Sequence, residues 1–133
     1  MCVSGDSPEI ILSYKVKIKS HNIKDDIMNN LRFHKIPFQY EGRNFDLIIS
    51  ESSNKSGFPA SLFSLYENNK VLGNVRFTPT IIAMQKILTN KSGIYQEEID
   101  KAAIKKFTGS DWITKVIKKN DPDFIFEDIL DSL

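Results

Sequence analysis

The chain has 133 residues, of which 41% are hydrophobic, and its 18 lysines and arginines nearly balance its 17 aspartates and glutamates. This length and composition suit one globular domain, and the net charge of +1 gives no overall attraction to nucleic acid or to anionic membranes. The single cysteine excludes an internal disulfide scaffold, and the sequence has neither a signal-peptide pattern nor a long apolar run. We therefore expect a cytoplasmic protein that makes no membrane contact.

The N-terminal part is expected to hold a flexible leader over residues 1–9, followed by a single domain over residues 10–133. The leader contains little that a core could bury. Residues 10–19 alternate apolar with polar side chains, which predicts a strand with one buried face. A helix is predicted next, over about residues 23–34, because apolar residues recur there at every fourth position.

A β-hairpin is predicted after this helix, with strands at 36–40 and 45–49. The four residues between the strands include Gly42, which can adopt the positive φ that a tight turn needs. The segment 52–59 follows and has the strongest loop signal in the chain, with small polar residues, a glycine and a proline. We expect this long loop to carry function.

A second hairpin and then a run of helices are predicted in the remaining sequence. Strands at 61–67 and 70–77 flank Asn68 and Asn69, and asparagine tolerates the positive φ of a two-residue turn. The strands are expected to end at Phe77. Four helices follow in the prediction, over residues 79–89, 95–107, 111–119 and 122–132. The third of them has a predicted buried stripe formed by Trp112, Ile113, Val116 and Ile117.

The order of these elements predicts an α+β fold. An antiparallel sheet of about five strands, in the order β-α-β-β-β-β, is followed by a helical C-terminal third packed on one face. Residues 10–77 are expected to be mainly β and residues 78–133 helical. A parallel, doubly wound sheet is disfavoured because the connections are too short for crossovers. A β-rich domain with a separate helical appendage stays open as an alternative.

Motifs for cofactors and metal ions are absent from the sequence. Every glycine stands alone, so no phosphate-binding loop of the Walker or dinucleotide type is present. His21 and His34 have no cysteine at a zinc-binding spacing. We therefore expect no cofactor and no metal, and catalysis is not the favoured role.

One enzyme is kept as an alternative, namely a Mg²⁺-dependent nuclease. Asp46 on one strand, together with Glu67 and Lys70 at the second hairpin, would supply two carboxylates and a lysine around a metal ion. The usual nuclease pattern places a single residue between its second carboxylate and its lysine, whereas two residues separate Glu67 from Lys70.

Two groups of lysines make nucleic-acid binding a further alternative. A row of lysines on one face of a strand can follow phosphates, although it also suits a solvated face or a protected edge. The first group consists of Lys15, Lys17 and Lys19. The second group, in the predicted helices, includes Lys105, Lys115, Lys118 and Lys119.

Protein binding is the function that the sequence favours. The segment 121–133 carries five acidic residues and no basic one, so its predicted helix would either neutralise the basic helices before it or dock on a partner. We expect a small inhibitor, an immunity protein or a phage anti-defence protein that blocks a partner protein by surface complementarity. An exposed sheet edge would also allow a homodimer.

The residues expected to contact the partner come from the long loop, the second hairpin turn and the acidic segment. They are Asn54, Lys55, Phe58, Asn68, Asn69, Asp123, Glu127, Asp128 and Asp131.

Overall fold

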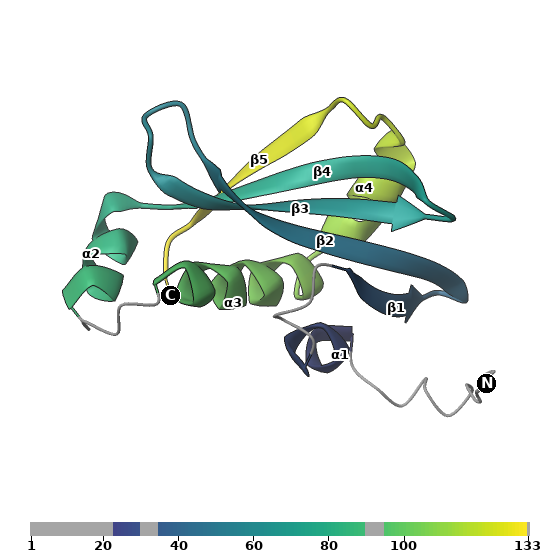
Figure 1. Cartoon of the computed structure of the whole chain (residues 1–133), viewed down its shortest axis with the longest axis horizontal. Coiled ribbons are helices and arrows are strands. Elements are labelled where there is room, and N and C mark those ends of the chain that lie inside the picture. The colour runs from purple at the N-terminus through teal and green to yellow at the C-terminus, as the bar shows by residue number, and fades with distance from the viewer. Residues whose placement is uncertain (1–22, 30–34, 90–94, 133) are drawn as a thin grey trace.

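The computed structural model describes residues 23–29, 35–89 and 95–132. In these segments, five strands form one sheet in the order β1-β2-β3-β4-β5, and helices pack against it (Figure 1). The α+β class predicted from the sequence is confirmed. Within the same segments, no helix combines the length and the apolar character needed to cross a membrane.

The first predicted hairpin is confirmed, with a shorter turn. Strand β1 (Ile36–Tyr40) pairs with β2 (Arg43–Ser53) in antiparallel register. Only Glu41 and Gly42 lie between the strands, with φ of 51° and 79°. A two-residue turn with positive φ at both positions matches the natural twist of paired strands, so the residues at 43 and 44 join the ladder rather than the loop.

The second predicted hairpin is also confirmed. Strand β3 (Pro59–Glu67) pairs with β4 (Lys70–Pro79), and Asn68 and Asn69 form the turn with φ of 54° and 66°. Both strands are longer than predicted because the flanking residues continue the ladder.

Helices α1 (Ile23–Asn29), α2 (Ile81–Thr89), α3 (Tyr95–Thr108) and α4 (Trp112–Lys119) lie where helices were predicted. Helix α2 begins two residues late because β4 continues through Pro79, and the hydroxyl oxygen of Thr80 accepts a hydrogen bond from the backbone N–H of Ala83 at 3.1 Å. The predicted leader over 1–9, the strand over 10–19 and the end of the first helix lie outside the described residues.

The predicted helix over 122–132 is wrong, and so is the all-helical C-terminal third. The segment forms strand β5 (Ile125–Leu130), which pairs with β4 in parallel. Its alternation explains the strand, because Phe126 and Leu130 face the core while Glu127 and Ile129 are exposed. Helices α2, α3 and α4 supply the long crossover that parallel pairing requires, which the sequence prediction had not allowed.

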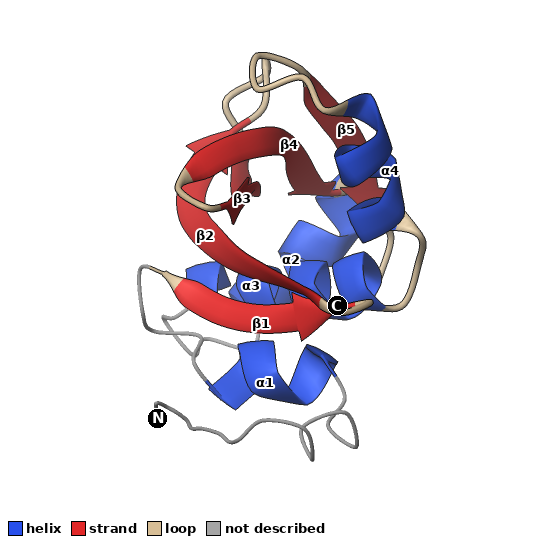
Figure 2. Ribbon diagram, turned by 90° about the vertical axis from the view of Figure 1, so that its right-hand side faces the viewer, coloured by secondary structure: helices blue, strands red, loops and turns tan. Residues whose placement is uncertain are grey.

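The sheet is strongly curved, and α3 and α4 lie on its concave side (Figure 2). The core there contains Phe63, Phe77 and Phe107, whose rings meet edge to face with centroids 5.2–6.5 Å apart. Helix α4 lies close to β4 because that strand has a glycine at position 73, where an added Cβ would be 3.0 Å from Val116 Cγ1. In the predicted stripe on α4, Ile113 and Val116 are buried, and Trp112 and Ile117 are half-buried against the core.

The convex face of the sheet carries the alternate residues of each strand. Those on the central strands are half-buried and mix apolar with polar character; they include Ile48, Leu62, Tyr66, Asn74 and Arg76. No described helix covers this face (Figures 1 and 2). Among the described residues, this face of the mostly antiparallel sheet is therefore uncovered, an arrangement that is common for antiparallel sheets.

Candidate functional site

A hollow of about 310 Å³ lies on the convex face, where the β2–β3 loop meets strands β4 and β5. Its lining comes from three separate parts of the sequence: Asn54, Lys55, Ser56, Arg76, Thr78, Glu127 and Ile129. We call the hollow that these seven residues line the convex hollow. The loop, which spans residues 54–58 and not the predicted 52–59, and the acidic segment are therefore brought together in space.

The loop side of the convex hollow is held by Asn54. Its side-chain oxygen accepts hydrogen bonds from the backbone N–H groups of Ser56 and Phe58, each at 2.9 Å. Gly57 has φ of 85°, a conformation that L side chains rarely adopt. Because asparagine and glycine fix the turn, the side chain of Lys55 is presented to solvent on a defined backbone.

Arg76 forms the floor of the convex hollow. Its Nη1 lies 3.2 Å from Oε2 of Glu127, and the two side chains are 19% and 57% exposed. Arg76 Nε is buried and has no hydrogen-bond partner among the described residues. A buried donor without an acceptor destabilises a protein. Glu127 contacts the guanidinium through Nη1, and its own side chain is exposed, so this ion pair borders the solvent.

The remaining predicted contact residues do not join this hollow. Phe58 is 36% exposed at the end of the same loop. Asn68 and Asn69 lie at the opposite end of the sheet, in the β3–β4 turn, and Asp123 precedes β5 on that same side. Asp131 lines a different hollow on the helical side. The structure therefore divides the predicted contact residues between separate surfaces.

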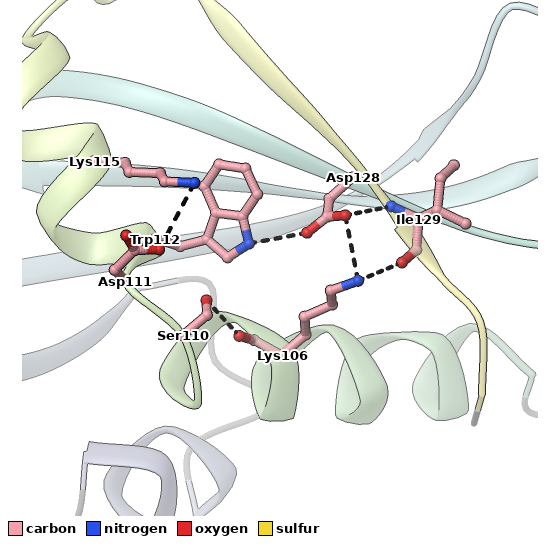
Figure 3. A network of polar contacts seen from close by, with 7 residues as sticks. All are labelled: Lys106, Ser110, Asp111, Trp112, Lys115, Asp128 and Ile129. Atoms are coloured by element: carbon pink, nitrogen blue, oxygen red, sulfur yellow. Dashed lines mark hydrogen bonds and ion pairs between the residues drawn. The ribbon is translucent and has the colours of Figure 1, made fainter.

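Asp128 has a structural environment of its own, on the concave side of β5 (Figure 3). One carboxylate oxygen accepts the indole N–H of Trp112 at 2.9 Å. The other accepts the backbone N–H of Ile129 at 2.7 Å and lies 3.2 Å from the ammonium group of Lys106. Lys106 also donates to the carbonyl oxygen of Ile129 at 2.6 Å. The predicted contact between the acidic segment and the basic helices thus exists, but it is made by a strand.

The three residues of the nuclease alternative are not brought together. Strand alternation places Asp46 on the convex face and Glu67 on the concave face. Two nitrogens of Arg43 hold the Glu67 carboxylate at 2.6 and 2.9 Å, and this hydrogen-bonded pair lowers the pKa of Glu67. Lys70 lies opposite Glu67 in the β3–β4 ladder, at the end of the two strands. Among the described residues, no group of three His, Cys, Asp or Glu side chains could hold a metal.

The lysines of the nucleic-acid alternative are divided between two places. Lys105 lines a hollow of about 540 Å³ between α1, α3 and the end of β5, where Lys24, Lys101 and Lys106 also lie. The other lysines of that group, Lys115, Lys118 and Lys119, are exposed on α4. The first group, Lys15, Lys17 and Lys19, lies outside the described residues.

A half-buried carboxylate that sequence reasoning missed lies between α3 and the sheet. Asp100 accepts hydrogen bonds from the hydroxyl of Ser61 and from Nε2 of Gln96. Burial raises the pKa of Asp100; the two hydrogen bonds oppose this shift, and the nearby carboxylates of Glu51 and Glu97 add to it. These contacts join α3 to β3.

Sequence reasoning also missed Arg76. Arg76 stands at an outward position of a strand whose other face is apolar, and that alternation was the available signal. Ile129 was assigned to a helix, so its exposure on a strand was not foreseen. No protein-family model, curated protein or solved structure shows a significant match to this chain. Its function must therefore be argued from the site.

Proposed function

We propose that this chain is a non-enzymatic protein-binding module, of the kind found among small inhibitors, immunity proteins and phage anti-defence proteins. One observation carries the proposal. Lys55, Arg76 and Glu127 are distant in sequence, yet they line a single hollow on the open face of the sheet. A loop held on a rigid sheet is a common way to build a recognition surface.

The chemistry of the convex hollow suits a protein partner. Lys55, Arg76 and Glu127 supply both signs of charge, and Ile129, 47% exposed, supplies an apolar contact at the rim. Protein interfaces combine apolar contacts with satisfied polar groups, and arginine is enriched in them. A partner carbonyl or carboxylate could accept a hydrogen bond from the Arg76 guanidinium, whose ion pair with Glu127 borders the hollow.

The test is affinity capture from a lysate of the native host, at about 0.15 M and about 0.5 M salt, because salt screens exposed charges. We expect one stoichiometric protein partner that survives the higher salt. A double variant, Lys55→Glu with Ile129→Asp, reverses one charge and adds another. It should abolish capture of the partner. Lys70→Glu is the matched control, since Lys70 is an exposed lysine at the other end of the sheet. Equal capture of the partner by the unmodified chain, the double variant and Lys70→Glu would refute the assignment of the binding site to the convex hollow.

A second proposal is nucleic-acid binding through the helical side. It is supported by the hollow of about 540 Å³ to which four lysines contribute. In that case the lysate would yield nucleic acid rather than protein, and the bound material would be released at the higher salt because lysine–phosphate contacts depend strongly on ionic strength. Lys101→Ala with Lys105→Ala would weaken that binding, whereas Lys55→Glu would leave it nearly unchanged.

A further inference from the structure

The open edge of β5 is adjacent to the convex hollow. Strand β5 is the last strand of the sheet, and on one side it pairs with β4. The carbonyl of Leu130 accepts a hydrogen bond from Thr80 N–H at 3.0 Å, so the peptide groups of Leu130 face β4. Because peptide groups alternate along a strand, those of Ile125, Glu127 and Ile129 point away from β4.

One end of this edge is already closed by side chains. The N–H of Ile129 donates to Asp128, and its carbonyl accepts from Lys106 (Figure 3). Charged side chains placed at an edge are a common means of stopping unwanted strand pairing. The outward peptide groups of Ile125 and Glu127 have no such partner among the described residues. The edge is therefore open over a short and defined length.

The other edge of the sheet is strand β1, and a proline protects it against strand pairing. In the β1–β2 register, Tyr40 and Arg43 flank the two-residue turn, so the peptide groups of residues 37 and 39 point outward. Position 37 is a proline, which has no N–H to offer. No proline lies in β5.

The side chains beside the open edge indicate what kind of strand would fit. On the concave side, the rings of Trp112, Phe126 and Phe124 follow one another edge to face, with centroids 5.4 and 4.7 Å apart. Phe124 is 39% exposed, so this aromatic row continues to the surface. An added strand would need apolar side chains on its concave face in order to extend the row.

Charge on the other side of the edge favours basic residues. Residues 121–133 carry five carboxylates and no cation. Asp123 and Glu127 are exposed beside the edge; Glu127 is paired with Arg76, whereas Asp123 has no ion pair among the described residues. A second copy of β5 would bring the same acidic composition to the edge, so a basic partner is the better complement.

We infer that the β5 edge binds an extended segment of a partner protein that is apolar on one face and basic on the other. The segment adds a strand to the sheet through the peptide groups of Ile125 and Glu127. Lys106 and Asp128 stop the pairing at Ile129. This inference rests on the proposed protein-binding function and specifies how the partner is held, by strand addition.

The experiment uses the full chain and three synthetic peptides of equal length. The first alternates valine with lysine, the second alternates valine with glutamate, and the third is the valine–lysine peptide with alternate backbone nitrogens methylated. Calorimetric titration should show binding of the first peptide only. Equal binding of the methylated peptide would show charge attraction without strand addition and would overturn the inference. Absence of binding by the first peptide, or equal binding by the glutamate peptide, would also overturn it.

Two variants of the chain locate the binding. Glu127→Pro removes an outward N–H while leaving the β4 ladder intact, and Glu127→Gln removes the same charge but keeps the N–H. We expect Glu127→Pro to weaken binding of the lysine peptide roughly tenfold, as for loss of a backbone hydrogen bond, and Glu127→Gln to weaken it much less. Amide hydrogen exchange on the unmodified chain should show peptide-dependent protection at Glu127, a readout that does not depend on how well the proline variant folds. No protection there would contradict strand addition.

The outcomes also separate this inference from the proposed function. A captured partner that depends on Lys55 and Ile129, but binds Glu127→Pro as well as it binds the unmodified chain, would leave the proposed function standing and refute strand addition. If the unmodified chain is a dimer and Glu127→Pro makes it monomeric, the edge binds a second copy, and the inference of a basic partner is wrong.

Discussion

The indole N–H of Trp112 donates to Asp128 across 2.9 Å and thereby joins helix α4 to strand β5. The same carboxylate contacts Lys106 of α3, so one side chain connects strand β5 to two helices. Edge-to-face contacts of Trp112 with Phe77 and Phe126 add an apolar connection to the same junction. The position of β5 therefore depends on a small number of contacts that can be removed one at a time.

Trp112→Phe tests this junction. The substitution keeps an aromatic ring but removes the donor, so a partly buried carboxylate loses a hydrogen bond. We expect the free energy of unfolding to fall by about 1–3 kcal/mol, as measured by urea denaturation. Asp128→Ala and the double variant complete a double-mutant cycle. If the two single effects simply add, Trp112 and Asp128 do not interact energetically and this account of the junction is wrong.

Gly73→Ala tests the close approach of α4 to the sheet. The added methyl group would lie 3.0 Å from Val116 Cγ1, so the helix or the side chain must shift. Overpacking of this kind costs about 1–3 kcal/mol. Combining it with Val116→Ala removes the contacting methyl, so the pair should be less destabilised than the sum of the single variants. Thermal unfolding of the four proteins gives the comparison, and simple additivity would argue against the steric explanation.

Asp100→Asn should change stability in a pH-dependent way. Burial raises the pKa of Asp100 in the folded chain, so the carboxyl favours folding when protonated, and this stability is lost as the pH rises through the folded-state pKa. Asparagine keeps an oxygen that can accept from Ser61 and Gln96. We therefore expect Asp100→Asn to be more stable than the unmodified chain at neutral pH, and the difference to shrink at acidic pH.

Urea denaturation across the pH range checks this prediction. Asp100→Ala is the control, because it leaves the Ser61 and Gln96 donors unpaired and should destabilise the chain by about 1–3 kcal/mol. A stability difference between Asp100→Asn and the unmodified chain that does not vary with pH would contradict the shifted titration.

Lys106→Met should open the protected end of the β5 edge. The substitution removes the ammonium group that occupies the carbonyl of Ile129, while the methionine retains much of the apolar stem. We expect concentration-dependent association in sedimentation experiments, because unprotected edges pair with other strands. Lys105→Met is the matched control, since the neighbouring Lys105 makes no such bond to β5. If Lys106→Met and Lys105→Met associate to the same extent, the cause is the loss of a positive charge and not the opening of the β5 edge.

Local signals were sufficient for most of the fold. Asn68 and Asn69 predicted a two-residue turn, and both have the positive φ expected. The spacing of apolar residues on α4 predicted the burial of Ile113 and Val116. These features depend on neighbours in sequence, for which backbone preference and periodicity are informative.

Strand β5 could not be recognised in the same way. Its six residues, IFEDIL, are compatible with either a short acidic helix or an alternating strand, and its pairing partner β4 lies some fifty residues earlier in the chain. A long-range contact decides between the two forms. The convex hollow was missed for the same reason, since Arg76 and Glu127 become neighbours only through parallel pairing.

The most direct test of the proposed protein-binding function is hydrogen–deuterium exchange of the chain with and without the partner captured from the native host. We predict that the partner protects residues 54–58 and 125–129, which border the convex hollow and the open edge, and leaves exchange at Asn68 and Asn69 unchanged. Protection confined to the β3–β4 turn or to the lysine-bearing side of α3 would contradict the account.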